Sequence, residues 1–348
     1  MKTIFTFLFL ILLILPSKFQ AQNTENDTSR ETNKVFISVP VIVMDKEGHY
    51  IPGLKKEDFT VYQDGINQQI TFFSTFNEPF KVSLMLDTSS STRKVISKIK
   101  SAAKNFVDSL NPNDQCQVTT FDSQLKIVTP FTSDKRVIKN SLDKVEINEY
   151  GGTIMYSAVD QIIQKSFNDV KGRNVIILLT DGDDFGSSIT KDELLKLLEE
   201  LDISIYTIFF DTGKNYSKSV NADGNLKKGK RSKKTRKNKK ENQNINSASK
   251  VYVMSEEEIE LNEKNNEIKA INSLKSMSDI TVGRFYRSDV RDLDKVFKNI
   301  IGELTQQYRL GYNSNDDLRN KATRDISVKA KRANVVIRTR GAISTRRR

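Results

Sequence analysis

Cysteine and histidine are almost absent from this sequence, and their scarcity excludes several kinds of site. Cys116 is the only cysteine, so an intrachain disulfide and a zinc site built from clustered cysteines are both impossible. His49 is the only histidine, and its setting in Lys46-Glu47-Gly48-His49 is typical of an exposed turn. A Ser-His-Asp triad would depend on this one residue, so we do not expect catalysis of that kind.

Long apolar runs are also scarce. The single one, Ile4 to Leu15, follows Lys2 and ends before Pro16 and Ser17. It is too short to span a hydrocarbon core of about 30 Å, so it predicts a signal peptide over residues 1–21, with an uncleaved anchor as the alternative. We expect the rest of the chain to be exported, whether periplasmic, at the cell surface or secreted. No cysteine follows the run, which excludes a bacterial lipid anchor.

The net charge of +12 is concentrated in one segment. Residues 214–250 hold thirteen Lys or Arg and two Asp or Glu, so the rest of the chain is close to neutral. A segment of this composition cannot pack into a core, and it predicts a flexible loop. Its most basic residues are Lys227, Lys228, Lys230, Arg231, Lys233, Lys234, Arg236, Lys237, Lys239 and Lys240.

Two roles for this basic loop stay open. It is either a solvated tether or a binding segment for an anionic envelope polymer or a membrane surface. Specific nucleic-acid recognition is not expected, because no aromatic residues are interleaved with the charges and the chain is expected to leave the cytosol.

The N-terminal part of the mature chain shows strand patterns. Residues 22–33 are polar and are expected to form a disordered linker. From Val35 to Val43 apolar residues alternate with others, the period of a half-buried strand. Phe59 to Gln63 and Gln68 to Thr75 are further strand-like runs, with Asp64-Gly65 between them, a dipeptide that tight hairpins favour. Residues 34–80 are therefore interpreted as a small β unit.

Between residues 81 and 306 the pattern changes to alternating strands and helices. Val82 to Leu86, Val175 to Leu179 and Ile203 to Phe210 are continuous apolar runs, as expected of strands covered on both faces. Amphipathic helical patterns separate them. This order predicts an α/β fold with a doubly wound, mostly parallel sheet, interrupted by the insertion at 214–250.

Strand patterns return over residues 307–348, which end in a basic tail. The strands at either end of the chain are too few to bury a sheet face alone. We therefore expect residues 34–80 and 307–348 to pair into one small β-sandwich that flanks the α/β domain. The apolar residues expected to face the first half from the second are Ile326, Val328, Val335 and Ile337.

Oxygen-bearing side chains follow the ends of the predicted central strands. Asp87, Ser89 and Ser91 come directly after the first strand, Asp181 comes after another, and Thr153 follows two glycines ahead of a helix. In open α/β sheets the carboxyl ends of parallel strands form the edge where ligands bind. Two carboxylates and three hydroxyls suit a hard ion, so these five residues predict a site for Mg²⁺ or Mn²⁺. One coordination position would remain for a ligand carboxylate.

Two other interpretations of Asp87 are available. By itself, Asp87 would be interpreted as a helix cap that acts through Ser91 or Thr92. A phosphatase of the haloacid dehalogenase type also places an aspartate after a strand, but it needs a second one two residues on, where this chain has Ser89. The positions of Thr153 and Asp181 favour the metal site over both.

The motifs Asp-x-Ser-x-Ser, Gly-Gly-Thr and Thr-Asp-Gly together resemble the metal-ion-dependent adhesion site (MIDAS) of the von Willebrand factor type A family. The resemblance implies direct ligation by Ser89, Ser91 and Thr153, with Asp87 and Asp181 often acting through water. Segments outside the domain resemble a bacterial exported subgroup of VWFA-related proteins: Val39 to Asp45, Gly53-Leu54, Asp58-Phe59, Asp64-Gly65 and Gln307 to Tyr312. The basic insertion departs from the family pattern.

The resemblance implies a function as well as a fold. It implies a non-enzymatic, exported, adhesion-type module that captures a protein ligand through Mg²⁺, with the ligand offering a carboxylate. The alternative is a structural or assembly scaffold at the cell envelope that recruits anionic partners through the basic loop.

The first prediction concerns this loop. Deleting Lys214 to Lys250 and bridging the gap should leave folding intact, because the entropic cost of a flexible loop grows only slowly with its length. We expect the melting temperature to change by less than about 4 °C, the shift that roughly 1 kcal/mol produces in a domain of this size. A collapse of the thermal transition in the deletion variant would show that the segment is structural.

Overall fold

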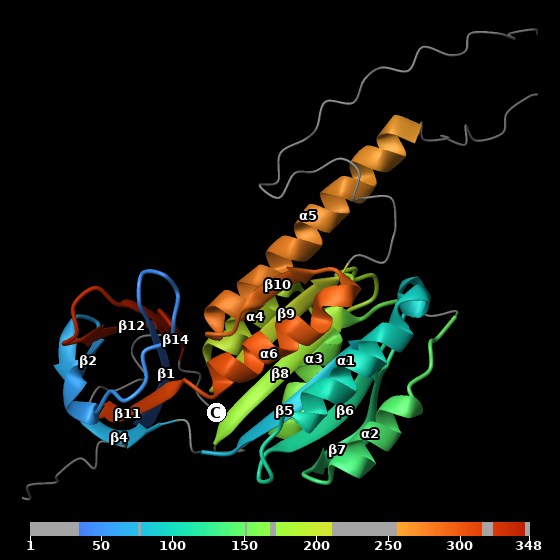
Figure 1. Ribbon diagram of the computed structural model, residues 1–348. Helices are drawn as coiled ribbons and strands as arrows, with labels where there is room; N and C mark the ends of the chain where they lie inside the picture. The colour runs from blue at the N-terminus through green and yellow to red at the C-terminus, as the bar shows by residue number, and fades with distance from the viewer. Residues whose placement is uncertain are drawn as a thin grey trace, which may run out of the picture.

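The computed structural model describes residues 35–75, 78–149, 152–167, 172–210, 256–314 and 323–344. Within these ranges the chain forms a helix-flanked sheet and, beside it, a pair of smaller antiparallel sheets (Figure 1). The predicted signal peptide, disordered linker and flexible basic loop concern residues 1–21, 22–33 and 214–250, which lie outside the described ranges.

The larger sheet has six strands in the order β10-β9-β8-β5-β6-β7. All neighbours run parallel except β6 and β7. The central strands β8 and β9 are buried along their whole length, which explains their continuous apolar sequences. The strands are β5 (Phe80–Asp87), β6 (Gln115–Phe121), β7 (Leu125–Thr132), β8 (Arg173–Thr180), β9 (Ile203–Phe210) and β10 (Phe285–Ser288). The expected doubly wound, mostly parallel sheet is confirmed.

Helices cover both faces of this sheet, and each face has its own apolar core. Side chains of α1, α2 and α6 pack on one face, and those of α3, α4 and α5 pack on the other. The helices are α1 (Ile96–Asp108), α2 (Lys135–Asp143), α3 (Met155–Ile162), α4 (Lys191–Glu199), α5 (Glu256–Ile280) and α6 (Leu293–Leu304). Short helical turns lie at η1 (Lys56–Asp58), η2 (Ser90–Lys94), η3 (Ile163–Phe167) and η5 (Val290–Asp292).

Helix α5 is longer than its apolar pattern indicates. Hydrophobic periodicity predicts a helix only around Ile268 to Met277, which is the part that packs on the sheet through Leu274 and Met277. The first half of α5 extends away from the body of the domain (Figure 1), and Leu261 there is 57% exposed. Periodicity marks buried faces, so it does not mark a helical segment whose described residues from Leu261 to Asn266 are mostly exposed. No helix in the described part of the chain is both long and apolar enough to cross a membrane.

The two smaller sheets combine strands from both ends of the chain (Figure 1). One has the order β13-β1-β11-β4 and the other β14-β12-β2-β3. Their strands are β1 (Val35–Met44), β2 (Phe59–Gln63), β3 (Ile66–Gln68), β4 (Ile70–Ser74), β11 (Tyr308–Ser314), β12 (Thr323–Ala330), β13 (Val336–Thr339) and β14 (Ala342–Ser344). One shared core joins early residues such as Val39 and Val61 to late ones such as Leu310 and Ile326, with Val335 and Ile337 packed at its margin.

The strand expected over Gln68 to Thr75 is not a single hairpin arm. The tight turn at Asp64-Gly65, where both residues have positive φ, joins β2 to the short strand β3. The chain then crosses to the other sheet, where β4 pairs with β11. A period-two pattern shows that residues are extended but not which sheet they join, so the sequence did not reveal this crossing.

A buried charge cluster joins the sandwich to the α/β domain. The Glu303 carboxylate on α6 is fully buried and accepts hydrogen bonds from Tyr206 Oη at 2.7 Å and from Tyr50 Oη at 3.3 Å. It also forms ion pairs with Arg284, at 3.0 Å, and with Arg338 of β13. Because Tyr50 and Arg338 belong to the sandwich, this single carboxylate connects both units.

A second set of contacts lies beside this cluster. Arg309 of β11 donates to Ser38 Oγ at 2.7 Å and pairs with Asp202, the residue before β9. Arg173, the first residue of β8, donates to the carbonyl of Leu304. The Arg309–Asp202 pair places the sandwich at the amino-terminal edge of the large sheet. The carboxyl edge lies roughly 25 Å away across an eight-residue strand and faces away from the sandwich.

Removing the charge of Glu303 tests this junction. Glu303→Gln leaves the partly exposed Arg284 and Arg338 beside a neutral group, and breaking an ion pair with a fully buried carboxylate is destabilising. We expect the free energy of unfolding to fall by about 3 kcal/mol in denaturant titrations. The control is Asp108→Asn, which removes the exposed pair with Lys139 and should have little effect. Equal effects of the two substitutions would contradict the importance of the junction.

Candidate metal centre

The two aspartates of the predicted site come from adjacent strands. Strands β5 and β8 pair in parallel, β5 ends at Asp87 and β8 at Thr180, and Asp181 follows immediately. Thr180 Oγ1 donates a hydrogen bond of 2.7 Å to Asp87 Oδ2. Asp87 is 1% exposed and Asp181 is 7% exposed. Two carboxylates are therefore withdrawn from water next to each other at the carboxyl edge of the sheet.

The serines lie on the turn between β5 and α1. The Ser89 amide donates to Asp87 Oδ1 at 2.9 Å, and Thr92 Oγ1 donates to the Ser89 carbonyl at 2.8 Å. This turn brings Ser89 Oγ and Ser91 Oγ within 3.1 Å of each other. Asp87 stabilises the turn that presents the two hydroxyls and does not cap α1, since Val95 at the start of that helix has no side-chain cap.

Thr153 lies on a third loop, which backbone bonds fasten to the others. Its side chain is 4% exposed, and its carbonyl accepts from the Phe185 amide at 2.8 Å on the loop that follows Asp181. The next amide, Ile154, donates to the Asp122 carbonyl at 2.8 Å. The structure thus brings the segments that carry all five predicted residues to one edge. Gly151, one of the two glycines before Thr153, lies outside the described ranges.

Asp122 is a residue of this edge that the sequence analysis did not select. Its Oδ2 accepts from Thr88 Oγ1 at 3.2 Å, and its Oδ1 accepts from Asn148 Nδ2 at 3.0 Å. The Asn148 amide in turn donates to the Thr88 carbonyl at 2.9 Å. Asp122 therefore fixes the position of the segment that holds Ser89. The signal that identified Asp87, an aspartate directly after a strand, is also present at Asp122.

Burial and charge both oppose ionisation of Asp87 in the bare protein. Burial raises the pKa of Asp87 to about 7, and the nearby Asp181 carboxylate adds to the rise. Hydrogen bonds from Ser89 and Thr180 act in the opposite direction but do not cancel it. A cation placed between the two carboxylates would remove this penalty, because an opposite charge favours the ionised form.

The donor set fits a hard divalent ion. Two carboxylates balance a charge of +2, and the three hydroxyls of Ser89, Ser91 and Thr153 add neutral oxygen ligands of the kind that Mg²⁺ accepts together with water. Nitrogen and sulfur donors, which softer ions prefer, are absent from these five residues. In the described ranges no group of three His, Cys, Asp or Glu could hold a metal ion. Any site at this edge therefore depends on the hydroxyls.

Gly182 allows a helix to pass close behind the site. Its φ is +88°, and a Cβ at this position would lie 2.7 Å from the Cβ of Ala270 on α5. Its amide donates to Thr180 Oγ1 at 2.9 Å. A larger residue here would push α5 away and disturb the hydroxyl that holds Asp87. The glycine of the Thr-Asp-Gly motif is therefore needed for close packing, while the threonine and the aspartate supply oxygen atoms.

The ten basic residues proposed for anionic partners, Lys227 to Lys240, lie outside the described ranges. Strand β9, which precedes the insertion, ends at Phe210 on the same sheet edge as Asp87, since β9 and β8 are parallel. The described part of the chain before the insertion therefore ends at the edge that carries the predicted metal site.

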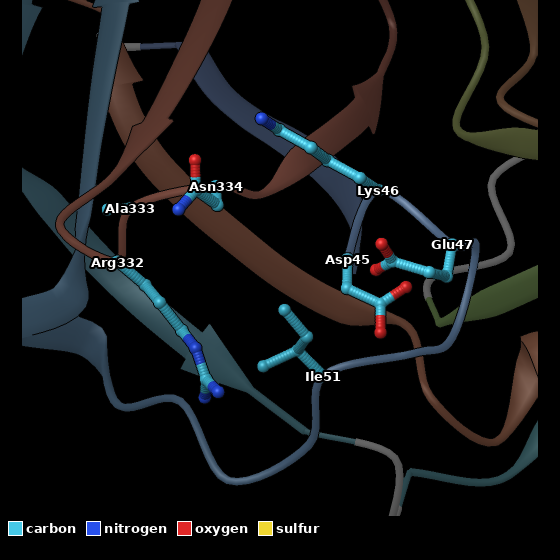
Figure 2. Close-up of a pocket in the computed structure, with 7 residues that line it drawn as sticks. All are labelled: Asp45, Lys46, Glu47, Ile51, Arg332, Ala333 and Asn334. Atoms are coloured by element: carbon cyan, nitrogen blue, oxygen red, sulfur yellow. The ribbon is translucent and has the colours of Figure 1, made fainter.

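A surface hollow elsewhere does not belong to this site. It has a volume of about 350 Å³ and lies on the sandwich, where Figure 2 shows Arg332 and Asp45 on either side of Ile51. The other lining residues are Lys46, Glu47, Ala333 and Asn334. None of the five predicted ligands lines the hollow. His49 is also on this unit, where it is exposed and pairs with Asp45 at 3.0 Å.

Comparison with known sequences finds a family match over this part of the chain. Residues 82–183 match the model of the von Willebrand factor type A domain, a range that begins in β5 and includes all five predicted ligands. An uncharacterized protein of Borreliella burgdorferi is 26% identical over 119 residues, which are 34% of this chain and 35% of that protein. The chain thus matches about a third of that curated relative.

Solved structures show more distant similarity. Proximal thread matrix protein 1 from the mussel byssus, solved with a zinc-occupied MIDAS motif, is 18% identical, with a TM-score of 0.45 over 70% of this chain and 49% of that one. BatB from Bacteroides thetaiotaomicron is 18% identical, with a TM-score of 0.42 over 65% of this chain and 97% of that one. A von Willebrand factor type A protein from Catenulispora acidiphila is 11% identical, with a TM-score of 0.44 over 82% and 73%.

Thr180 offers a test of how the site is held. Thr180→Val keeps the shape of the side chain but removes the hydroxyl that binds Asp87 Oδ2, and loss of an outer hydrogen bond typically weakens metal binding 10- to 100-fold. We expect a loss of about tenfold in Mg²⁺ affinity by isothermal titration. Thr119→Val, at a buried threonine in the middle of β6, is the control and should bind as wild type does. Unchanged binding by Thr180→Val would mean that this bond does not orient Asp87.

Proposed function

Because the chain contains a von Willebrand factor type A domain, a type that is typically a non-catalytic binding module, we propose that it is an exported, adhesion-type protein that binds its ligand through a metal ion. The metal is Mg²⁺ or Mn²⁺, and the ligand is a protein that offers a carboxylate. The residues that hold the ion are Asp87, Ser89, Ser91, Thr153 and Asp181.

One observation carries this proposal. Asp87 and Asp181 are both buried at the ends of adjacent strands, where burial, together with repulsion from Asp181, raises the pKa of Asp87. Such a pair is unfavourable unless a cation balances it. Three hydroxyls in the same place complete an oxygen donor set, and a hard ion with six positions would still have room for one more ligand.

The chemistry of this edge supports binding over catalysis. When bound, the ion would supply a positive charge that attracts an anionic group of a partner. The only histidine, His49, is exposed on the sandwich and is not part of the edge. The carboxylates of Asp87 and Asp181 would be occupied by the ion and unable to serve as general bases at the same time.

The first test of the proposal measures metal binding. Wild type and Asp87→Ala are titrated with Mg²⁺ and with Mn²⁺ in a calorimeter, and their folding is compared by circular dichroism. We expect wild type to bind one equivalent of either ion, and Asp87→Ala to keep its fold but lose detectable binding. The matched control, Asp45→Ala, removes an aspartate of the sandwich and should bind as wild type does. Equal heats from wild type and Asp87→Ala would exclude this site.

The ligand requirement is tested next. The protein is immobilised and incubated with envelope extract in Mg²⁺, then washed with EDTA or with salt. A partner released by EDTA supports capture through the ion. A partner that resists EDTA and is released only by salt supports the alternative of a scaffold that recruits anionic partners, because screening weakens contacts between exposed charges.

A further inference from the structure

Phe185 is an aromatic side chain exposed beside the candidate metal centre. It is 71% exposed, the highest value among the large apolar residues in the described part of the chain. Its amide donates to the Thr153 carbonyl at 2.8 Å, so its backbone is in direct contact with one proposed metal ligand. It also follows another, Asp181, by only four residues.

The exposure of Phe185 is not a result of a loosely held loop. The Asp184 carboxylate accepts from the Tyr156 amide at 3.1 Å and from Ser187 Oγ at 2.6 Å. The Ser157 amide donates to Ser187 Oγ at 2.9 Å, and the Ser188 amide donates to Ser157 Oγ at 2.8 Å. The residues on both sides of Phe185 are therefore fastened to the start of α3, while its ring remains in water.

The loop is closely packed beside Phe185. A Cβ added at Gly186 would lie 3.2 Å from Ile154 Cγ2, so the loop is closely packed against the residue that follows Thr153. An exposed ring on a loop with a fixed backbone can be covered by a partner, and aromatic residues are enriched in the buried cores of protein interfaces. Leaving such a ring in water costs free energy that a partner recovers by covering it.

Charge at the same rim limits the kind of ligand. Asp183 and Asp184 directly precede Phe185, and Asp122 lies on the neighbouring loop. The positive charge of Arg93 is already paired with Glu149 at 2.6 Å. Beyond the proposed ion, the described side chains of this rim therefore favour a ligand with one negative charge over a ligand with several, since like charges placed together reduce affinity.

We propose that Phe185 forms the apolar half of the ligand-binding surface, so that the ligand is a single carboxylate carried next to an aromatic or branched apolar group. This inference rests on the proposed metal-dependent function, because the ion is what binds the carboxylate. In a protein partner, the corresponding feature is an acidic residue adjacent to an exposed apolar side chain.

Small carboxylates test the inference without a known partner. The full chain is loaded with Mn²⁺, and binding of acetate and of 3-phenylpropionate is measured by the paramagnetic broadening of their proton signals. We expect wild type to bind 3-phenylpropionate about five- to tenfold more tightly than acetate, as covering part of one ring would give. Adding EDTA should abolish both interactions, and 3-phenylpropanol, which lacks the carboxylate, should bind poorly.

Three variants make the result specific. Phe185→Ser should bind Mn²⁺ as wild type does and lose the preference for 3-phenylpropionate, while Phe185→Leu should keep most of it. Ile66→Ser removes an apolar side chain that is 63% exposed on the sandwich and should keep all of it.

The outcomes separate the two proposals. If wild type binds no Mn²⁺, the proposed function fails and this inference fails with it. If wild type binds Mn²⁺ and holds both carboxylates equally, or if Phe185→Ser retains the preference, only the role of Phe185 is wrong. Loss of Mn²⁺ binding in both Phe185 variants would assign the ring a structural role and would also overturn the inference.

Discussion

Two carboxylates withdrawn from water at the ends of adjacent strands set the central constraint on this protein. Asp87 and Asp181 lie together because β5 and β8 are neighbours in a parallel sheet, and both residues are almost completely buried. Such a pair needs either a proton or a cation. The turn at Ser89, the hydroxyl of Thr180 and the close packing at Gly182 all hold the pair in this arrangement. The described residues around this pair thus hold two carboxylates together without supplying a positive charge of their own to balance them.

The remainder of the structure fixes the direction in which this edge faces. The sandwich is built from both ends of the chain and contacts the opposite edge of the large sheet through buried charges centred on Glu303. A cluster in which two arginines share one fully buried carboxylate is costly to break, so it favours one orientation of the two units over many. Under the proposed function, this arrangement would present the candidate metal edge to a partner in one direction.

The sequence predicts the large sheet and its ligand edge because both depend on local patterns: apolar runs for β8 and β9, and aspartates directly after strands. It does not predict the contacts that depend on distant segments. Thr180 can hold Asp87 only because β5 lies next to β8. In the sequence, Glu303 is one polar residue near the end of an amphipathic helix, and its role depends on the pairing with Arg338 of β13. The hydrophobic pattern also does not predict that β4 joins the second sheet or that α5 begins at Glu256, because neither feature changes the period of the pattern.

The most direct test of the central claim is a crystal structure of the protein grown with Mn²⁺, analysed by anomalous scattering. The account predicts one strong anomalous peak at the carboxyl edge of the sheet, within bonding distance of the hydroxyls of Ser89, Ser91 and Thr153 and flanked by Asp87 and Asp181. It predicts no such peak in crystals of Asp87→Ala grown in the same solution. An empty edge in the wild-type crystals, with Mn²⁺ present in the solvent, would contradict it.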